Sequence, residues 1–491
     1  MTAIQEPKIQ EPAIQAPTDM LFLLSDEHHA RMLGAAGHPF VQTPHLDALA
    51  VRGTRFENAY CNSPICVPSR ASLATGRYPH EIDAWDNAAP YTGAHRSWHH
   101  ALREAGHEIV SVGKLHYRGG DDYGFTEELM PLHVVNGVGD LKGMLRRPLP
   151  EKGGAADLAN GAGRGTSDYS DYDARIAKRA RDWLRKRAEA RARGDATRFV
   201  LFVSFVMPHF PLVAPEPCYD LYADRGLDEL RTGLTAPAPD HPVLREMRGY
   251  FTYDDHFDDE RRAVALRAYL GMVTRLDQLV GELLDTLRET GLGPTTRVLY
   301  TSDHGDNLGN RGWWGKSNMY EDSVAVPMIL AGPGVPSGSV CRTPVSLVDV
   351  APTMHAALGL PPAADYRGRS LLSIAAEGDD PERPVFAEYH AAGSPTGLFM
   401  LRRGRWKLVA YAGERAQLFD LENDPGERRD LAECSKHIGT LQVMRAALTK
   451  AVDTDEVDRK AFDAQETLIE RHGGRDAILS TTEIPYTPAP A

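Results

Sequence analysis

The stretch Cys66-Val67-Pro68-Ser69-Arg70-Ala71-Ser72-Leu73-Ala74-Thr75-Gly76-Arg77 decides how the rest of the chain is interpreted. A turn-rich segment precedes it, and Pro68 suits the first turn of a helix because it lacks the N–H that would be unpaired there. The pattern predicts a helix that ends near Gly76 and has Cys66 at its N-terminus, where the free N–H groups favour an anion. Arg70 falls about one turn later on the same side. The stretch therefore predicts a thiol and a guanidinium beside a pocket for an oxyanion; the competing interpretation is a structural cysteine buried at a helix start.

Composition bounds the class of protein. The chain has 491 residues, of which 42% are hydrophobic and 25% charged, enough for one large domain and a smaller one. A net charge of −13 argues against a nucleic-acid partner, and no apolar run reaches transmembrane length. Five scattered cysteines show neither zinc spacing nor a disulfide framework, and the N-terminus lacks the pattern of a signal peptide. We therefore expect a cytoplasmic protein without a membrane partner.

Short apolar runs alternate with amphipathic segments along the first three hundred residues. The runs are typical of buried strands and the segments of helices. Expected strands are 20–24, 54–60, 108–113, 199–206 and 297–302, and expected helices are 44–52, 97–105, 172–193 and 261–289. This alternation predicts an α/β fold with a large mixed, mostly parallel sheet sandwiched by helices. Residues 131–166 are rich in glycine and are expected to form a long loop.

The texture changes after about residue 368, where short strand-like runs follow one another closely. They cover 385–389, 398–402, 406–411 and 417–420, and a helical segment follows at 441–452. We expect a small C-terminal α+β subdomain with an antiparallel sheet. The domain prediction is a proline-rich arm at 1–17, a catalytic α/β domain at 18–375, the subdomain at 376–480 and a flexible tail at 481–491.

Ionisable residues follow several of the expected strands directly. They are Asp26, Lys114, His116, His209, Asp303 and His304. Ligands of open α/β sheets bind at the carboxyl ends of the strands, so these side chains converge if the strands share one sheet. Two carboxylates and an imidazole form a plausible set for a divalent metal.

Several motifs resemble the type I sulfatases. The Cys-x-Pro-Ser-Arg…Thr-Gly stretch matches their activation signature. Further matches are Leu-Leu-Ser-Asp at 23–26, Thr-Pro-His-Leu-Asp at 43–47, Gly-Lys-Leu-His at 113–116, Ser-Asp-His-Gly-Asp at 302–306 and Gly-Lys-Ser at 315–317. The resemblance runs from about residue 20 to about residue 430. It is closest to the branch that holds choline sulfatases and phosphonate monoester hydrolases, and it implies the alkaline-phosphatase type of fold.

This resemblance implies a nucleophile and a metal site. In the family the cysteine is oxidised to Cα-formylglycine by a formylglycine-generating enzyme, and the hydrated aldehyde attacks the ester. The implied ligands of one divalent ion, Mn²⁺ or Ca²⁺ with Mg²⁺ as an alternative, are Asp26, the modified Cys66, Asp303 and His304. Glu27 stands where a second Asp is common in the family, so it either ligates the metal or flanks it.

The resemblance also implies which residues handle the ester. The residues implied to contact the substrate are Asn87, Lys114, His209 and Lys316. Arg70 would hold the formylglycine hydrate, while Lys114 and Lys316 would neutralise charge on the sulfate. His209 would protonate the leaving alkoxide, and His116 would be the base that collapses the sulfated hydrate.

The expected activity is hydrolysis of an alkyl or aryl sulfate monoester. A phosphonate monoester or phosphodiester hydrolase with the same nucleophile is the alternative, although such relatives replace Gly-Lys-Leu-His with hydroxyl-rich sequence, so Lys114 and His116 favour sulfate. A third hypothesis is a non-catalytic homologue that binds sulfate esters and keeps Cys66 unmodified. The resemblance further suggests a homodimer or homotetramer.

Two groups of aromatic side chains complete the predictions. Trp313 and Trp314 are interpreted as packing a loop onto the core, with a cage for a quaternary ammonium as the alternative. The remaining histidines near the motifs are expected at the surface or as helix caps; they are His28, His29, His99 and His100.

Overall fold

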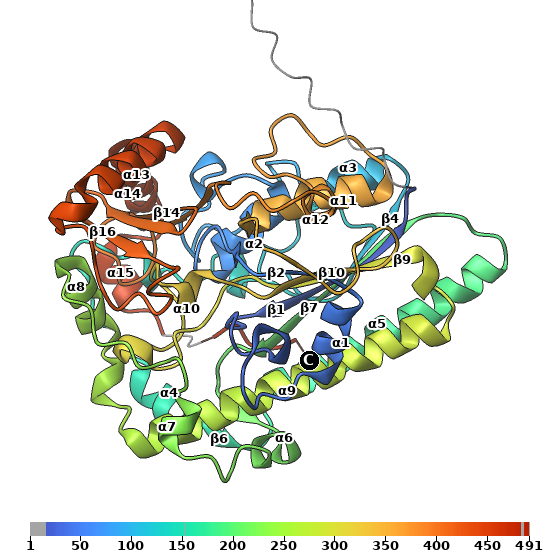
Figure 1. Cartoon of the computed structure of the whole chain (residues 1–491), viewed down its shortest axis with the longest axis horizontal. Coiled ribbons are helices and arrows are strands. Elements are labelled where there is room, and N and C mark those ends of the chain that lie inside the picture. The colour runs from blue at the N-terminus through green and yellow to red at the C-terminus, as the bar shows by residue number, and fades with distance from the viewer. Residues whose placement is uncertain (1–15, 152, 483–485, 491) are drawn as a thin grey trace, which may run out of the picture.

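The structure is a computed structural model that describes residues 16–151, 153–482 and 486–490 (Figure 1). The expected N-terminal arm lies almost entirely outside these residues. An eight-stranded sheet forms the centre, in the order β11-β2-β10-β9-β1-β7-β4-β5. Its strands are β1 (Asp19–Asp26), β2 (Gly53–Phe56), β4 (Glu108–Lys114), β5 (Glu127–Leu132), β7 (Phe199–Pro208), β9 (Thr296–Ser302), β10 (Met328–Ala331) and β11 (Ser339–Cys341).

Strand direction confirms the predicted mixed, mostly parallel sheet. β1 pairs in parallel with both β7 and β9, and β4 pairs in parallel with β7 and β5. β10 runs antiparallel to β9 and β2, while β11 is parallel to β2. Four neighbouring strands, β9, β1, β7 and β4, therefore end at the same edge.

The apolar run in β1 shows why the sheet is covered on both faces. Successive side chains of a strand point to opposite faces. Phe22 and Leu24 accordingly belong to one buried cluster, whereas Leu21 and Leu23 belong to another. A strand with apolar residues on both faces requires helices on both sides of the sheet.

The helices form these two outer layers (Figure 1). One layer contains α1 (Pro44–Val51), α5 (Asp168–Ala192) and α9 (Asp259–Glu289). The opposite layer contains α2 (Cys66–Thr75), α3 (Trp98–Glu104), α11 (Val350–Leu358) and α12 (Leu371–Ala376). Although α9 is long, its polar face makes it an amphipathic cover, and none of the described helices is apolar over the length that a membrane crossing requires.

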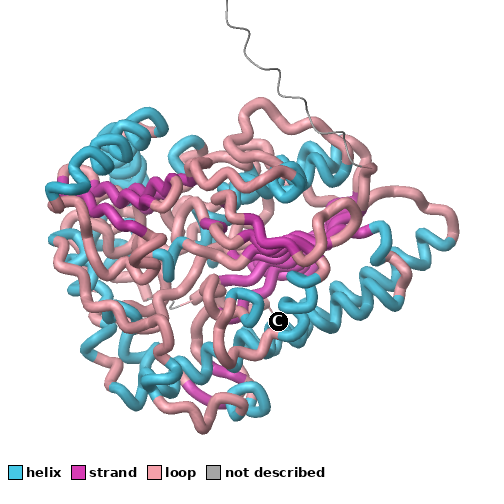
Figure 2. Tube along the Cα trace, in the orientation of Figure 1, coloured by secondary structure: helices cyan, strands magenta, loops and turns pink. Residues whose placement is uncertain are grey.

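A second, antiparallel sheet lies beside the large one (Figure 2). It comprises β13 (Val385–Tyr389), β14 (Leu398–Arg403), β15 (Trp406–Tyr411) and β16 (Glu414–Asp420), and it confirms the expected C-terminal antiparallel sheet. The helices that follow are α13 (Ile438–Ala451), α14 (Thr454–Arg471) and α15 (Arg475–Leu479). The sequence reading did not anticipate α14 or α15. The exact domain boundaries stay a prediction.

Several local expectations differ from the structure. The strand expected at 54–60 is two strands, because the chain leaves the large sheet after Phe56 and β3 (Ala59–Tyr60) pairs with β12 (Val345–Ser346). The expected loop at 131–166 holds α4 (Ala155–Gly161) and β6 (Gly163–Arg164), which pairs with β8 (Val213–Ala214). The intervening chain to β9 adds α6 (Glu216–Asp220), α7 (Leu227–Leu230) and α8 (Pro242–Phe251), and α10 (Glu321–Val324) precedes β10.

The expectation that the four histidines lie at the surface or cap helices is wrong for His28, His29 and His99, and it holds for His100 as a cap. His28, His29, His99 and His100 are all buried. His28 bonds the hydroxyl of Tyr300 at 2.6 Å. His100 does act as a cap, since its Nδ1 accepts a hydrogen bond from the Ser97 N–H at 3.2 Å at the start of α3. The Ser97–His100 pair has the spacing of a capping box, whereas the partner of His28 comes from a distant segment that spacing could not reveal. Trp313 and Trp314 are buried, which confirms their packing interpretation.

Candidate active site

The carboxyl ends of four neighbouring strands gather the predicted ionisable residues at one edge of the large sheet. β1 ends at Asp26, and β9 leads into Asp303 and His304. β4 ends at Lys114, and His209 follows β7 directly. Because these strands are adjacent and parallel, the sheet order brings together side chains that are up to 278 positions apart in the sequence.

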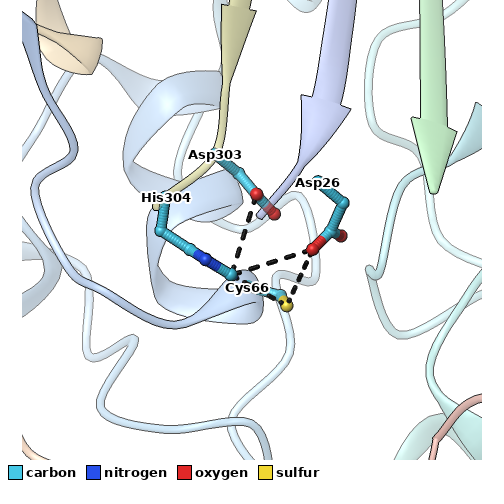
Figure 3. A group of neighbouring side chains, drawn as sticks. All are labelled: Asp26, Cys66, Asp303 and His304. Carbon is cyan, nitrogen blue, oxygen red and sulfur yellow. Dashed lines mark hydrogen bonds and ion pairs between the residues drawn. The ribbon is translucent and has the colours of Figure 1, made fainter. Parts of the chain in front are cut away.

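The predicted helix brings Cys66 to the same edge. Helix α2 begins at Cys66 and ends at Thr75, and Gly76 closes it with a φ of +66°. The Sγ of Cys66 lies 3.2 Å from His304 Nε2 and 3.6 Å from the nearer carboxylate oxygen of Asp26. Figure 3 shows Asp26, Cys66, Asp303 and His304 converging on one point from β1, α2 and the end of β9.

Arg70 connects the acidic side chains of this group. Its Nε donates to Asp303 at 2.8 Å, and one Nη donates to Asp26 at 2.9 Å. The other Nη donates to the Lys114 carbonyl at 2.7 Å and to the Ser204 hydroxyl at 2.9 Å. The side chain is 2% exposed. A planar guanidinium with several fixed donors suits this task, because it orients two carboxylates at once.

The donor set fits a divalent cation. Ligand atoms of Asp26, Cys66, Asp303 and His304 all lie within 4.8 Å of one another. The Nδ1 of His304 lies 3.0 Å from the Gly305 carbonyl, which assigns the proton to Nδ1 and leaves the Nε2 lone pair free. That Nε2 lies 3.8 Å from Asp26 and 3.7 Å from Asp303, too far for hydrogen bonds. Two carboxylate oxygens and one imidazole nitrogen thus face a common point without satisfying one another.

Positive groups control ionisation at this point. Lys114 Nζ lies 2.6 Å from Asp26. Burial opposes ionisation of Asp26, but the charges of Lys114 and Arg70 outweigh it and hold the pKa of that carboxyl well below its ordinary value. Burial, with Asp26 nearby, raises the pKa of the Cys66 thiol to about 12. An unmodified Cys66 is therefore a neutral thiol near pH 7 and a poor nucleophile.

A second group surrounds Lys316 beside the first. Lys316 Nζ lies 2.8 Å from His209 Nε2 and 3.1 Å from Glu27 Oε2. Burial, reinforced by Asp306, raises the pKa of Glu27 to about 8 despite the charge of Lys316. The other carboxylate oxygen of Glu27, Oε1, is buried and has no hydrogen-bond partner in the described part of the chain, and the residue has a φ of +67°. Glu27 therefore contacts the lysine–histidine pair, and ligand atoms of Asp26, Glu27 and His209 also lie within 4.8 Å of one another.

His116 is also held in an unusual backbone conformation. Its φ is +61°, a region that residues other than glycine seldom adopt. Its N–H donates to the Leu132 carbonyl at 2.8 Å, and its Nε2 lies 2.9 Å from the hydroxyl of Thr487. Burial lowers the pKa of His116 well below its ordinary value, so the ring is neutral near pH 7.

Asn87 lies at the same helix N-terminus but has a supporting contact there. Its Oδ1 accepts a hydrogen bond from the Val67 N–H at 3.1 Å, which satisfies one donor in the first turn of α2. Three residues that contact the site residues or one another were not predicted from the sequence: Ser204, Tyr169 and Thr487. Ser204 lies inside an apolar strand run, and this interruption was the one available signal. Tyr169 and Thr487 carried none.

Comparisons with known proteins agree with this geometry. The family model described as Sulfatase matches residues 18–360, and a model described as N-sulphoglucosamine sulphohydrolase, C-terminal, matches residues 309–454. A choline-sulfatase of Rhizobium meliloti is 33% identical over 461 residues, covering 91% of this chain and 88% of that protein. Arylsulfatase K of Bos taurus is 29% identical over 454 residues, with coverage of 86% and 80%.

Solved structures show the same fold. The phosphonate monoester hydrolase of Agrobacterium radiobacter superposes with a TM-score of 0.69 at 24% identity, covering 88% of this chain and 95% of that one. A sulfatase structure from Bacteroides thetaiotaomicron VPI-5482 gives a TM-score of 0.71 at 22% identity, with coverage of 91% and 94%. At these identities the likeness concerns the fold.

Proposed function

From the premise that this chain belongs to the sulfatase family and is a sulfuric ester hydrolase, we propose that it cleaves an alkyl or aryl sulfate monoester to alcohol and sulfate through a formylglycine at position 66. One observation carries the proposal. Cys66 begins α2 at the point where Asp26, Asp303 and His304 converge. The Cys66 Sγ stands where the hydrate oxygens of formylglycine would lie, and the thiol itself is too weakly acidic to serve as the nucleophile.

The residues present fit the metal that the family implies. Asp26, Asp303 and His304, with the hydrate at position 66, would hold one divalent ion, and Glu27 would flank it. When bound, such an ion supplies positive charge that favours ionisation of the hydrate and neutralises the sulfate. Oxygen and imidazole ligands suit Mn²⁺, Ca²⁺ or Mg²⁺, and the imidazole favours Mn²⁺.

The first chemical step breaks the ester bond. One hydroxyl of the hydrate attacks sulfur, and the S–O bond to the alcohol breaks as the new O–S bond forms. His209 would pass to the departing alkoxide a proton received from Lys316 Nζ, which lies 2.8 Å from its Nε2, and the proton that leaves the attacking hydroxyl would restore this pair. Lys114 and Lys316 would balance charge on the sulfate oxygens, while Arg70 fixes the ligands.

The second step releases sulfate. His116 would take the proton of the second hydroxyl, the C=O bond of formylglycine would re-form, and the C–O bond to sulfate would break. Water then adds to the aldehyde and restores the hydrate. The low pKa of His116 keeps its ring neutral and able to accept that proton. A geminal diol therefore permits turnover without attack of water on sulfur.

A phosphonate monoester hydrolase with the same nucleophile is the second candidate. The similarity to the Agrobacterium radiobacter enzyme supports it at the level of fold. The basic pair Lys114 and His116 and the identity with the choline-sulfatase favour the sulfate ester.

The experiment is mass spectrometry of the peptide that contains Cys66, from protein co-expressed with a formylglycine-generating enzyme. Conversion of the thiol to the aldehyde removes about 18 Da. The converted protein is then assayed with 4-nitrophenyl sulfate, choline-O-sulfate and a phenyl phosphonate ester, with Cys66→Ala as control. Conversion with sulfate hydrolysis that C66A lacks supports the proposal. Faster hydrolysis of the phosphonate ester supports the second candidate, the phosphonate monoester hydrolase. A protein that is neither converted nor active supports the hypothesis of a binding homologue.

A further inference from the structure

The centre of the proposed site is almost closed to solvent. Cys66 is 1% exposed, and the outermost histidines, His209 and His116, are 5% and 8% exposed. Part of the cover comes from residues 486–490, near the end of the chain. The sequence predicts a flexible tail from residue 481, whereas the structure places 486–490 against the catalytic domain, and Tyr486 and Ala489 pack on its buried cluster.

Thr487 contacts this domain through both its side chain and its backbone. Its hydroxyl lies 2.9 Å from His116 Nε2, and its carbonyl accepts a hydrogen bond from the Tyr169 hydroxyl at 2.6 Å. The Pro490 carbonyl accepts one from Arg175 at 2.5 Å. Two contacts to α5 thus flank the histidine contact, so the segment is bound at several points.

The Thr487 contact leaves His116 in a state useful for proton transfer. An imidazole has two ring nitrogens, and a hydrogen bond at one of them fixes the orientation of the ring. Nε2 has the Thr487 hydroxyl, whereas Nδ1 is buried and has no hydrogen-bond partner among the described residues. One nitrogen is anchored by the tail, and the other is free to take a proton.

The segment also extends an aromatic wall beside His209. The Tyr486 ring centroid lies 5.2 Å from that of Tyr169, and Tyr169 lies 6.2 Å from His209. Phe210 stacks on His209 at 4.1 Å. Because His209 is the proposed acid for the leaving group, the alcohol half of the ester would lie beside these rings.

We propose that residues 486–490 form the outer wall of the substrate pocket and that Thr487 is a positioning residue for His116. The role of Thr487 rests on the proposed function, because it acts through the base of the second step. The covering role does not, since it concerns only access to position 66.

The covering role is tested on the unconverted thiol, without any catalysis. Protein made without the formylglycine-generating enzyme is treated with iodoacetamide, and labelling of Cys66 is followed by peptide mass spectrometry. A chain that ends at Thr482 should label at Cys66 at least tenfold faster than the full chain. Cys61, which is also buried, serves as the internal reference for unfolding. Unchanged labelling of Cys66 in the shortened chain overturns the cover.

Two further outcomes are informative. Equal acceleration at Cys61 and Cys66 means that the shortened chain unfolds, and Tyr486→Ala in the full chain then decides: faster labelling of Cys66 alone supports the cover and no change overturns it. Protection that disappears on dilution to a monomer would place the segment on a neighbouring copy and overturn its assignment to the same chain.

The positioning role is tested on the converted enzyme. Thr487→Val keeps the shape of the side chain and removes the hydroxyl; kcat should fall at least tenfold with KM changed less than threefold, and the acid limb of the pH profile should shift. Thr487→Ser should restore kcat to within threefold of the original. Thr482→Val, at an exposed position of the same tail, is the control. An unchanged kcat in T487V overturns the role, while a wild type without sulfatase activity refutes the proposed function and leaves the labelling result standing.

Discussion

Replacing Arg70 by lysine tests whether the shape of the guanidinium, and not its charge alone, holds the metal ligands in place. Arg70 makes four hydrogen bonds of 2.7–2.9 Å, to Asp303, Asp26, the Lys114 carbonyl and Ser204. The single ammonium group of a lysine cannot reach all four acceptors that surround the planar guanidinium, so at least two of these acceptors lose their hydrogen-bond donor. Each hydrogen bond to a charged group contributes about 1.5–3 kcal/mol, so Arg70→Lys should cost about 3–6 kcal/mol.

The same substitution should weaken metal binding. Asp26 and Asp303 are oriented by Arg70, and removal of a partner that orients a ligand typically costs about 10–100-fold in metal affinity. Calorimetric titration of Mn²⁺ into the metal-stripped R70K protein measures this loss directly. The arginine acts here through the ligands, so the affinity loss should accompany the loss of stability.

Differential scanning calorimetry measures the stability term. With about 2.1 cal/mol/K of unfolding entropy per residue and 491 residues, the unfolding entropy is about 1 kcal/mol/K. The melting temperature should therefore fall by about 3–6 °C. Arg103→Lys is the matched control, because Arg103 also makes two-pronged contacts to a carboxylate, Asp122, but at the surface, where a pair contributes about 0–1 kcal/mol. A melting temperature within 1 °C of the wild type in R70K, with unchanged Mn²⁺ affinity, would refute the reasoning.

Three further substitutions have expected outcomes. Gly113→Ala should destabilise the protein by about 3 kcal/mol or more, since Gly113 has a φ of +99° and a Cβ there would lie 2.2 Å from the Ser204 carbonyl. Gly106→Ala is the control, because Gly106 has a φ of +86° in open space and the substitution should cost only about 1 kcal/mol. Urea unfolding measures the free energy of unfolding of both variants. Burial holds the pKa of His99 well below 6.5, so the unfolded chain binds a proton that the folded chain does not, and stability falls as the pH drops below 6.5. His99→Phe should remove about 1 kcal/mol of the loss between about pH 6.5 and 5.5, and an unchanged slope contradicts this. Glu27→Gln should leave Mn²⁺ affinity within about threefold while lowering kcat, because Glu27 contacts the lysine–histidine pair; a hundredfold affinity loss in titration would make Glu27 a ligand.

The site could be predicted from sequence as far as strand ends determine it. Asp26, Lys114, His209 and Asp303 each follow an apolar run, and a parallel sheet brings such positions to one edge. Cys66 was predictable because proline and glycine mark the two ends of its helix. In these cases local pattern and topology agree, so no long-range information beyond the strand order was required.

The remaining parts depend on contacts that no local pattern encodes. Thr487 meets His116 across 371 positions, and a Thr- and Pro-rich terminal stretch has the composition of an unattached tail. The four buried histidines were expected at the surface or as helix caps because polarity usually indicates exposure, and His100 alone among them is a cap. His28 and His99 instead bond Tyr300 and the Tyr123 carbonyl, which lie on other segments. Burial of a polar side chain follows from its partners, and partners are a property of the tertiary fold.

An acidic protein can nevertheless present a positive site to an anion. The chain carries a formal charge of −13, but Asp26 and Asp303 contact Arg70, and Asp26 also contacts Lys114. Lys316 adds a third cation beside Glu27 and His209. Burial raises the pKa of Glu27 to about 8, so this carboxyl opposes the cations less than a fully ionised one would, and a divalent ion would add further positive charge. Charge alone then accepts a sulfate ester and a phosphonate ester alike, since both are anions. Selection between leaving groups must therefore come from the neutral surface around the acid, the aromatic side chains to which residues 486–490 contribute.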